Sequence, residues 1–534
     1  MSKPPNYRII FNWDNSPHGT SEVPQSMETF LEKVYSPLED TQVDAHFWCL
    51  GDQPLAHWKS DIFESAGDVH GRKYENVSRY IHMENIRQML ERGEDPQVAV
   101  INRAHELGIH AYASIRMNDN HFNGAQIEDM DKLHDSALTK MRIDHPEWLL
   151  GDKTTEWMAM SWNYGIPEVR EYMHTYIKEV CSFYDWDGIE LDWQRHAFHL
   201  PQDYGYRMRY VLTDLQRAVR NITNKIAEER GRPFYLAARV APSLEMCQRI
   251  GYDVPVWVAE GLVDILIPAG GYGTDPSIDV SSYVDLCQGT EVSVYPGLDV
   301  WIVSIPDGEH TGTEEFVGPE DPETKDKMRN RAAASKYYSA GANGIYTFNW
   351  YANKDSKREL LNQLGLPETL RRTDKIYAST HRSLRKEGSW RGALRNDRIL
   401  GEVPVPLKYT ITGDGPAVII NVADDLTVDA PKYIELRVHL DQWVKEDIVR
   451  LFWNEEERIN IEINYRPYQD TVGNPFRAHI SDVGPSVWLR SVMNASEILQ
   501  GSNRVKVVLE KRNPRLANDI VLTNVELLLK FGND

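Results

Sequence analysis

The stretch DGIELDWQRHAFH, from Asp187 to His199, decides the fold. In its first half, the apolar residues Ile189 and Leu191 alternate with the acidic residues Glu190 and Asp192, which is typical of a short β-strand. Successive side chains of a strand point to opposite faces, so the two carboxylates are expected to point the same way. Two acids aimed together repel each other and cannot be buried without partners. The strand end is therefore a candidate active site.

A purely structural explanation of the same stretch is also open. Arg195 and His196 follow the strand and could serve as counter-charges for a salt-bridged strand end. Aromatic residues gather at the same place, which favours a ligand-binding role.

Composition narrows the classes of protein. With 534 residues, the chain is long enough for two or three domains. Its net charge of -21, from 59 Lys and Arg against 80 Asp and Glu, argues against a nucleic-acid partner. No apolar run is long enough to span a membrane. The start, MSKPPNYRII, lacks the apolar core of a signal peptide, which indicates a cytoplasmic protein or an exported one whose leader was removed. The oligomeric state cannot be predicted.

No metal or cofactor is expected. The four cysteines lie far apart without CxxC spacing, so they indicate neither a zinc site nor a disulfide framework. No three His, Asp or Glu residues have the spacing of a catalytic metal site either.

The first 365 residues repeat one unit, a short β-rich apolar run followed by a helical stretch. The eight runs are Tyr7–Phe11, Val43–Cys49, Gly108–Ile115, Gly188–Trp193, Phe234–Val240, Val263–Pro268, Glu291–Tyr295 and Gly344–Phe348. Polar or aromatic residues follow nearly every run. A (β/α)₈ (TIM) barrel collects its active site from all strand ends, whereas an open doubly wound sheet concentrates it at one switch point. The pattern predicts a barrel over residues 1–365.

The remainder predicts a second domain. Residues 366–401 are basic and irregular, and are expected to join the two domains. Residues 402–534 contain short alternating strands without a strong helix, which predicts an antiparallel β-sandwich of jelly-roll type. The stretch ILQGSNRVKVVLEK resembles galactose-binding-like modules, so the domain is either a structural cap or a sugar-binding module.

The segment from Gly188 to His196 resembles the G-x-x-x-D-x-x-x-H stretch of the α-amylase superfamily, whose Asp is the nucleophile. It is still more similar to the family 10-like glycosyl hydrolases, in which a D-G-[IV]-x-x-D run closes the fourth strand. This resemblance implies a glycoside hydrolase with Asp192 as nucleophile. Where α-amylases have an arginine, this chain has Glu190, and Arg116 or Arg239 is expected to supply the positive charge.

A second resemblance is to family 18 chitinases, which carry D-G-x-D-x-D-x-E at the same strand end. DGIELDWQ differs at two positions, Glu190 and Gln194. Gln194 replaces the catalytic Glu and cannot donate a proton as an acid. This alignment implies a sugar-binding barrel without hydrolytic activity.

Hydrolysis of an O-glycosidic bond needs two carboxyl groups that flank the anomeric carbon. With Asp192 as nucleophile, the acid/base partner should come from another strand end, and Glu245 is the candidate. Glu190 and Asp299 are the reserves. A retaining mechanism is expected, because neighbouring barrel strands lie about 4.8 Å apart.

Other residues at strand ends are candidate sugar contacts, because aromatic faces stack on pyranose rings and polar side chains bind hydroxyls. They are Trp13, His46, Trp48, Arg116, Asn118, His121, Glu190, Arg195, His196, Arg239, Tyr272, Asp299, Trp301 and Trp350. The arginines and histidines among them suggest a substrate with sulfate or carboxylate groups. The glycine-rich stretch AGGYGTD leaves a further possibility open, a barrel enzyme that acts on a phosphorylated metabolite.

Overall fold

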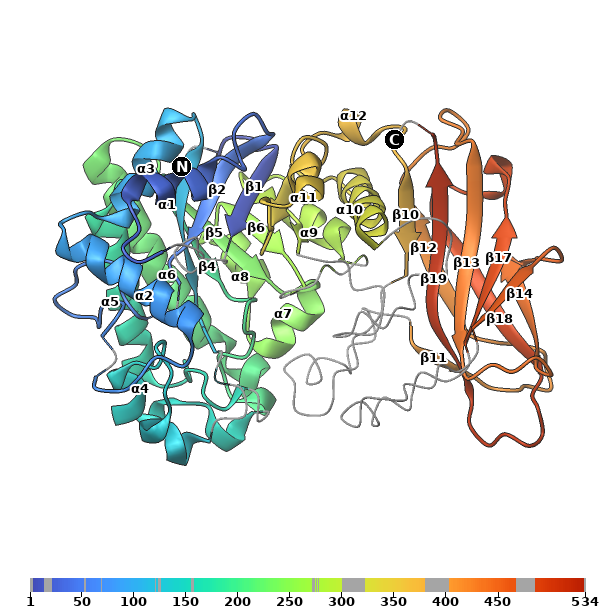
Figure 1. The fold of residues 1–534 in the computed structure, drawn as a ribbon, viewed down its shortest axis with the longest axis horizontal. Coiled ribbons are helices and arrows are strands. Elements are labelled where there is room, and N and C mark those ends of the chain that lie inside the picture. Colours follow the sequence, from blue (N-terminus) through green and yellow to red (C-terminus); the bar gives the residue numbers. More distant parts are fainter. Residues whose placement is uncertain are drawn as a thin grey trace.

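The computed structural model describes residues 3–13, 22–51, 54–68, 70–120, 122, 126–154, 158–270, 274, 276, 278–299, 322–379, 403–466 and 486–532. Its first half is a barrel of parallel strands surrounded by helices (Figure 1). The barrel strands are β1 Ile9–Trp13, β2 Val43–Cys49, β3 His110–Arg116, β4 Gly188–Asp192, β5 Tyr235–Val240, β6 Ile265–Pro268, β7 Ser293–Val294, β8 Gly297–Leu298 and β9 Ile345–Thr347.

The barrel closes through its seventh strand position. The sheet runs in the order β7-β6-β5-β4-β3-β2-β1-β9-β8, so β7 and β8 stand at its two ends. Only Tyr295 and Pro296 separate β7 from β8 in the chain, and both keep the ladder intact. The Tyr295 amide donates to the Leu266 carbonyl, and the Tyr346 amide donates to the Pro296 carbonyl. β7 and β8 are therefore one interrupted strand, which confirms the predicted (β/α)₈ barrel and excludes the open sheet.

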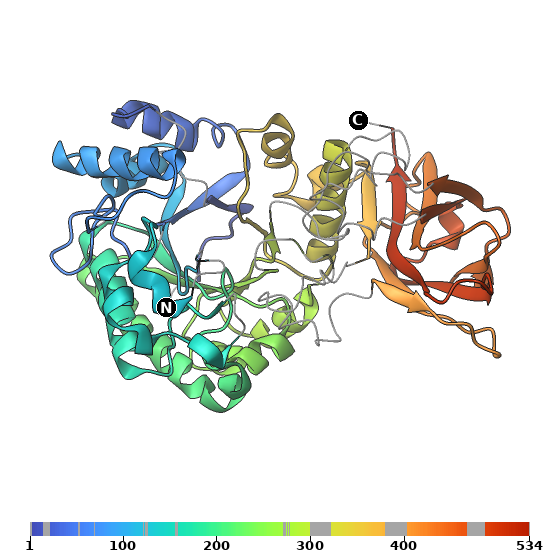
Figure 2. The same ribbon diagram turned by 60° about the horizontal axis from the view of Figure 1, so that its bottom comes forward.

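Helices cover the outside of this barrel (Figure 2). They are α1 Met27–Tyr35, α2 Val77–Glu91, α3 Pro96–Glu106, α4 Lys140–Asp144, α5 Pro167–Phe183, α6 Gly205–Arg230, α7 Leu244–Ile250, α8 Val254–Ala259, α9 Val280–Cys287, α10 Pro322–Ser339, α11 Asp355–Leu360 and α12 Pro367–Leu370. Their ends follow local sequence signals: α5 begins at a proline, whose missing N–H costs nothing there, and α6 ends at Gly231 with a φ of 63°.

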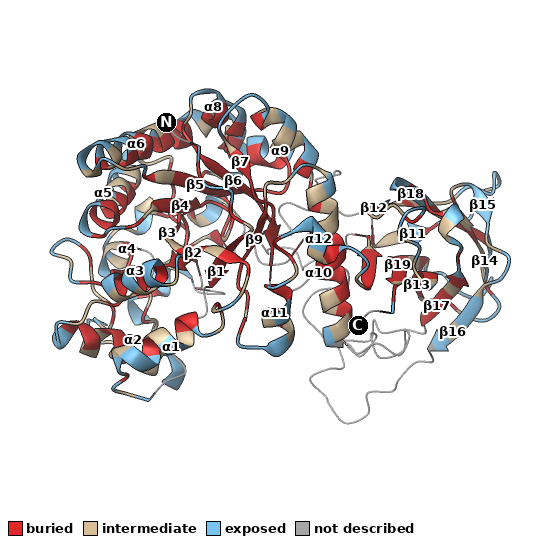
Figure 3. Cartoon of the chain, turned by 90° about the horizontal axis from the view of Figure 1, so that it is seen from above, coloured by how far each residue is buried: buried red, intermediate tan, exposed pale blue. Residues whose placement is uncertain are grey.

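The strands have two buried faces of different composition. On β4, Ile189 and Leu191 join the cluster of side chains that packs against the helices. The inside of the barrel holds a separate cluster that includes Ile10, Phe47 and Tyr346. Glu190 and Asp192 alternate with Ile189 and Leu191, so they lie on the inner face. Figure 3 shows the strands almost entirely buried beneath the helices.

The second half of the chain is an antiparallel β-sandwich, as expected. One sheet has the order β10-β19-β13-β17-β16, with β11 also paired to β19, and the other has the order β12-β18-β14-β15. The strands are β10 Lys375–Ala378, β11 Val405–Leu407, β12 Ala417–Val422, β13 Tyr433–Asp441, β14 Ile448–Trp453, β15 Glu456–Glu457, β16 Glu462–Arg466, β17 Ser486–Val492, β18 Gly501–Lys511 and β19 Ile520–Lys530.

Helix α10 joins the two domains, and it lies between the barrel and the sandwich in Figures 1 and 2. Ala333 and Ala334 belong to the barrel core, whereas Ala332 belongs to the core of the sandwich. Arg329 makes a buried ion pair with Glu526 of β19, with Nη2 2.5 Å from Oε1. The interface therefore combines apolar packing with one buried charge pair.

The domain boundaries at residues 365 and 402 stay predictions. Strand β10 falls within the segment expected to join the domains, and it pairs with β19 of the sandwich. We therefore propose that the sandwich begins near Lys375. Among the helices that the structure describes, none is both long enough and apolar enough to cross a membrane.

Candidate active site

A row of charged side chains crosses the carboxyl ends of three adjacent strands. Arg116 of β3 is the register partner of Asp192 of β4, and Asp192 is the register partner of Arg239 of β5. All three side chains are buried. An aspartate thus stands between two arginines at the end of the barrel where enzymes of this fold carry their active sites.

Asp192 accepts hydrogen bonds from two kinds of donor. The backbone amides of Gln194 and Arg195 donate to Oδ1, each at 3.0 Å. Nη1 of Arg239 lies 3.0 Å from Oδ1 and 3.2 Å from Oδ2. These donors satisfy an ionised carboxylate. The loop after β4 thus binds Asp192 through its backbone, and Arg239 supplies the counter-charge that the structural explanation assigned to Arg195 and His196.

Arg239 also bridges to the seventh strand position. Its Nη2 lies 3.1 Å from Oδ1 of Asp299, which directly follows β8. The guanidinium packs 3.8 Å from the ring centre of Phe348. Burial lowers the pKa of Arg239, but Asp192 and Asp299 raise it more, so the net shift is upward. One buried arginine therefore holds two buried aspartates from different strands.

Glu190 lies on the same face of β4 as Asp192, one inward position earlier. Its Oε2 accepts hydrogen bonds from the Ser114 hydroxyl at 2.5 Å and from Nδ2 of Asn12 at 3.3 Å. Burial and the charge of Asp192 raise the pKa of Glu190 from 4.5 to about 8, against the opposing effects of Ser114, Arg239 and Tyr346. The raised pKa favours the protonated form of Glu190, which lies one inward position below Asp192 on the same strand.

Beyond Arg116, the row of charged side chains continues into the loop after β3. Nη1 of Arg116 lies 3.4 Å from Oδ2 of Asp119. Nδ1 of His196 lies 3.8 Å from Oδ1 of the same aspartate. Asn118 exchanges hydrogen bonds with the backbone of Trp162 and donates a further one to the Phe198 carbonyl. Asn118 therefore ties three loops of the barrel rim together.

Four of the tryptophans and histidines predicted as sugar contacts lie against helices. Trp13 packs in the cluster between strands and helices. His46 contacts the Tyr35 hydroxyl of α1, and burial lowers its pKa to about 3. Trp48 donates to Gln97 of α3, and Trp350 donates to the Lys357 carbonyl of α11. Their role as sugar contacts stays a prediction that this placement does not support.

Glu245 is exposed in the first turn of α7, which follows β5. It comes after the same strand end that carries Arg239. His121, Tyr272 and Trp301 lie outside the described residues, as does most of the stretch AGGYGTD. The contacts expected of these residues remain predictions.

Three residues beneath the row were missed by the sequence argument. Asn12 of β1 and Ser114 of β3 contact Glu190, and Tyr346 of β9 lies close enough to affect its pKa. All three sit on inward positions of their strands. Ser114 is the register partner of Glu190 on β3. The alternation of inward and outward side chains along the strands could therefore have predicted its position.

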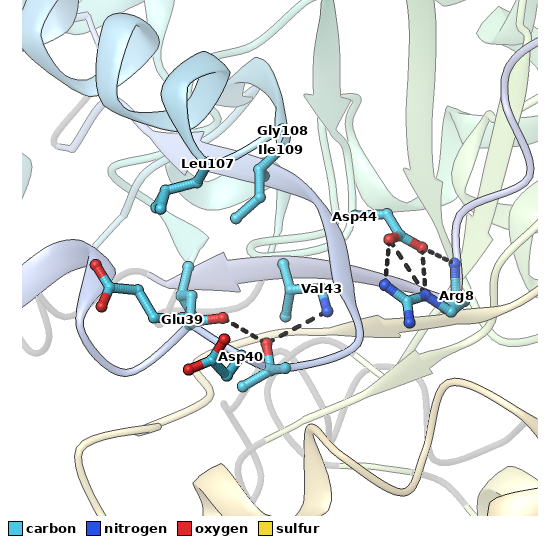
Figure 4. A pocket seen from close by; sticks show the side chains of 10 residues that line it. Arg8, Glu39, Asp40, Val43, Asp44, Leu107, Gly108 and Ile109 are labelled. Atoms are coloured by element: carbon cyan, nitrogen blue, oxygen red, sulfur yellow. Dashed lines mark hydrogen bonds and ion pairs between the residues drawn. The ribbon is translucent and has the colours of Figure 1, made fainter.

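The described residues contain no group of three or more His, Cys, Asp or Glu side chains that could hold a metal ion. A pocket of about 340 Å³ opens at the opposite end of the barrel, where β1, β2 and β3 begin (Figure 4). Its charged wall is the pair of Arg8 and Asp44, with a shortest distance of 2.7 Å. In this fold that end contributes to stability rather than to chemistry.

The barrel and its buried carboxylates define a glycoside-hydrolase-like (β/α)₈ protein. Residues 69–228 match the family model described as Glycosyl hydrolase-like 10, which confirms the resemblance drawn from the fourth strand. The matched segment contains Glu190 and Asp192 but ends before Arg239. No curated protein matches the sequence.

Solved structures with a similar chain path include several glycosidases. An Anoxybacillus α-amylase is 12% identical with a TM-score of 0.38, and the match covers 95% of this chain and 99% of the amylase. A family 18 N-acetylglucosaminidase from Paenibacillus barengoltzii is 13% identical with a TM-score of 0.33, covering 51% and 87%. A Paenibacillus cycloisomaltooligosaccharide glucanotransferase is 10% identical with a TM-score of 0.34, and this chain spans 57% of its length. These likenesses are too distant to assign a function.

Proposed function

We propose that the protein hydrolyses O-glycosidic bonds with retention of configuration, and that Asp192 is the nucleophile. The observation that carries this proposal is the contact of Asp192 with Arg239 and two backbone amides, directly above a protonated Glu190. A retaining glycosidase needs one carboxylate that stays ionised and can attack the anomeric carbon. Asp192 accepts hydrogen bonds from the Arg239 guanidinium and two backbone amides, the kinds of partner that an attacking carboxylate requires.

Glu245 is proposed as the acid/base group. The acid must reach a leaving oxygen on the other side of the sugar from the nucleophile. Glu190 lies deeper in the barrel on the same strand as Asp192, and Asp299 is paired with Arg239. Glu245 is exposed and follows the neighbouring strand β5. Of the three candidate acids, it is therefore the one that a bound sugar and water can reach.

An uncharged sugar is the proposed substrate. Arg239 is paired with Asp192 and Asp299, and Arg116 is paired with Asp119. Two guanidinium charges are thus matched by three aspartates within the described residues. These ion pairs therefore leave no excess of positive charge to attract a sulfated or carboxylated glycan.

The test begins with purified protein and a panel of neutral and sulfated polysaccharides, with product sizing and NMR of the first-formed anomer. Cleavage with retention supports the proposal, and an inverted first product contradicts the mechanism. On an activated aryl glycoside, Glu245→Ala should recover turnover on addition of azide, because azide attacks the glycosyl-enzyme intermediate in place of water and needs no general base. Glu260→Ala, at an exposed carboxylate on the barrel wall, is the control and should retain normal turnover.

A second function, sugar binding without hydrolysis, is favoured by one observation. Gln194 stands where family 18 chitinases carry their catalytic acid, and it is buried with no hydrogen-bond partner for Oε1 among the described residues. An amide at this position can bind a sugar but cannot protonate it. Binding of glycans by wild type without any cleavage, together with gain of cleavage in Gln194→Glu, would establish this alternative.

A further inference from the structure

Three exposed tyrosines occur within seven residues where α6 begins. Tyr204 is 51% exposed, Tyr206 is 51% exposed and Tyr210 is 60% exposed. Tyr206 and Tyr210 are separated by four residues of one helix, so they are neighbours on its outer side. Large aromatic side chains usually bury most of their surface, so three exposed rings in seven residues form an unusual surface.

This surface lies at the same end of the barrel as Asp192. β4 ends at Asp192, and α6 begins at Gly205 after the intervening loop. In a (β/α)₈ barrel, each helix starts at the end where the preceding strand finishes and returns to the opposite end. The tyrosines therefore belong to the rim that surrounds the carboxyl ends of the strands.

The start of α6 is held firmly against its neighbours. A Cβ atom on Gly205 would lie 2.5 Å from the Arg249 carbonyl oxygen of α7, so only glycine allows this close approach. Arg209 Nε donates to Oδ2 of Asp253 at 3.0 Å, and its Nη1 donates to the Tyr206 carbonyl at 2.7 Å. Two neighbouring segments thus fix the position of the first turn.

Tyr206 itself is oriented by a charge. The Arg209 guanidinium lies 4.3 Å from the centre of the Tyr206 ring, within the range of a cation–π contact. Asp253 in turn holds Arg209. The ring is therefore exposed and yet fixed, so a ligand that stacks on it loses little side-chain entropy on binding.

We infer that Tyr204, Tyr206 and Tyr210 form a surface site that binds a carbohydrate chain outside the active site. A pyranose ring offers a flat face of C–H groups that packs on an aromatic ring, and its hydroxyls bond to planar polar side chains. Gln202, Asp203 and Arg207 are exposed beside the tyrosines and supply such groups. The inference rests on the proposed function, since the chain bound here is the polymer whose bonds the barrel would cleave.

The experiment uses the full-length protein with Asp192→Asn, so that binding is measured without cleavage. Native gels containing amylose, dextran, xylan or soluble chitin derivatives serve as probes. The double variant Tyr206→Ala and Tyr210→Ala is expected to weaken retention by about three- to tenfold in the gel that retains the parent protein. Phe183→Ala is the matched control, because Phe183 is 56% exposed at the end of α5, on the opposite end of the barrel.

The outcomes separate this inference from the proposed function. If the active protein cleaves a polymer, the double variant should raise KM for the polymer and leave kcat/KM for a short aryl glycoside unchanged. If no probe is cleaved but retention still depends on the tyrosines, the surface site stands and the proposed hydrolysis fails. Equal retention of parent and double variant, or no retention of the parent by any probe, overturns the inference.

Discussion

Arg239 holds Asp192 through one guanidinium nitrogen that lies 3.0 and 3.2 Å from the two carboxylate oxygens. Both side chains are fully buried, and the other guanidinium nitrogen binds Asp299. A buried charge is tolerated only with such partners. The candidate nucleophile is therefore part of a charge network that links the fourth, fifth and seventh strand positions of the barrel.

Asp192→Asn should lower turnover by several orders of magnitude, because an amide can neither attack the anomeric carbon nor stabilise its positive charge. The fold should survive, since Asp299 still neutralises Arg239. Initial rates on the substrate identified by the polysaccharide panel measure the effect. Asp214→Asn, at an exposed residue of α6 paired with Arg217, should behave as wild type, and near-full activity of Asp192→Asn would rule out this nucleophile.

Arg239→Met should destabilise the barrel by about 3–5 kcal/mol, because it leaves Asp192 and Asp299 buried without their shared cation. Urea unfolding followed by tryptophan fluorescence measures the change. Arg217→Met removes a surface arginine paired with Glu260 and Asp214, and should cost far less stability than Arg239→Met. Equal costs for the two variants would show that the buried network is not a stabilising unit.

Glu190→Gln should change the pH dependence of stability. The folded-state pKa of Glu190 is raised from 4.5 to about 8, so its stabilising effect is full below pH 4.5 and is lost as the pH rises to 8. Glutamine cannot ionise, so the variant does not lose this stability as the pH rises. Its Tm relative to wild type should therefore rise between pH 5 and pH 8 in differential scanning calorimetry. A constant difference across this window would contradict the protonated state of Glu190.

The ion pair between Arg329 and Glu526 should show strong coupling across the domain interface. Either Arg329→Met or Glu526→Met removes one charge of a buried ion pair and should cost about 3–5 kcal/mol. The double variant should cost less than the sum, with a coupling of about 1–3 kcal/mol. The same cycle on Arg371 and Asp429, an ion pair at the protein surface, should give a much smaller coupling. Additive costs at Arg329 and Glu526 would contradict the pairing.

The fold could be predicted because the barrel strands are short apolar runs that alternate with helical stretches. The faces of the strands were harder to predict. On β4, acids alternate with Ile189 and Leu191, so the inner face is evident. On β2, the helix-facing His46 and Trp48 alternate with the inner residue Phe47, and all are buried. Strands covered on both sides lack a polar face, so sequence alone does not show which residues point inward.

The site was predictable only in part for a related reason. The sequence offered Arg116 and Arg239 as partners of Asp192, and both flank it in the sheet. The directions of the two side chains distinguish them. Arg239 forms an ion pair with Asp192, whereas Arg116 forms one with Asp119. Asp119 lies in a loop, and loop geometry has no periodic signal in sequence. The pairing of charges therefore required coordinates.

The burial of α10 limits how the two domains can be separated. All residues from 328 to 334 are buried, and a run of that length passes around the whole helix circumference. A barrel expressed alone would expose Met328 and Ala332 to water and would separate Arg329 from Glu526. The sandwich therefore cannot be deleted or exchanged unless the surface of α10 is redesigned.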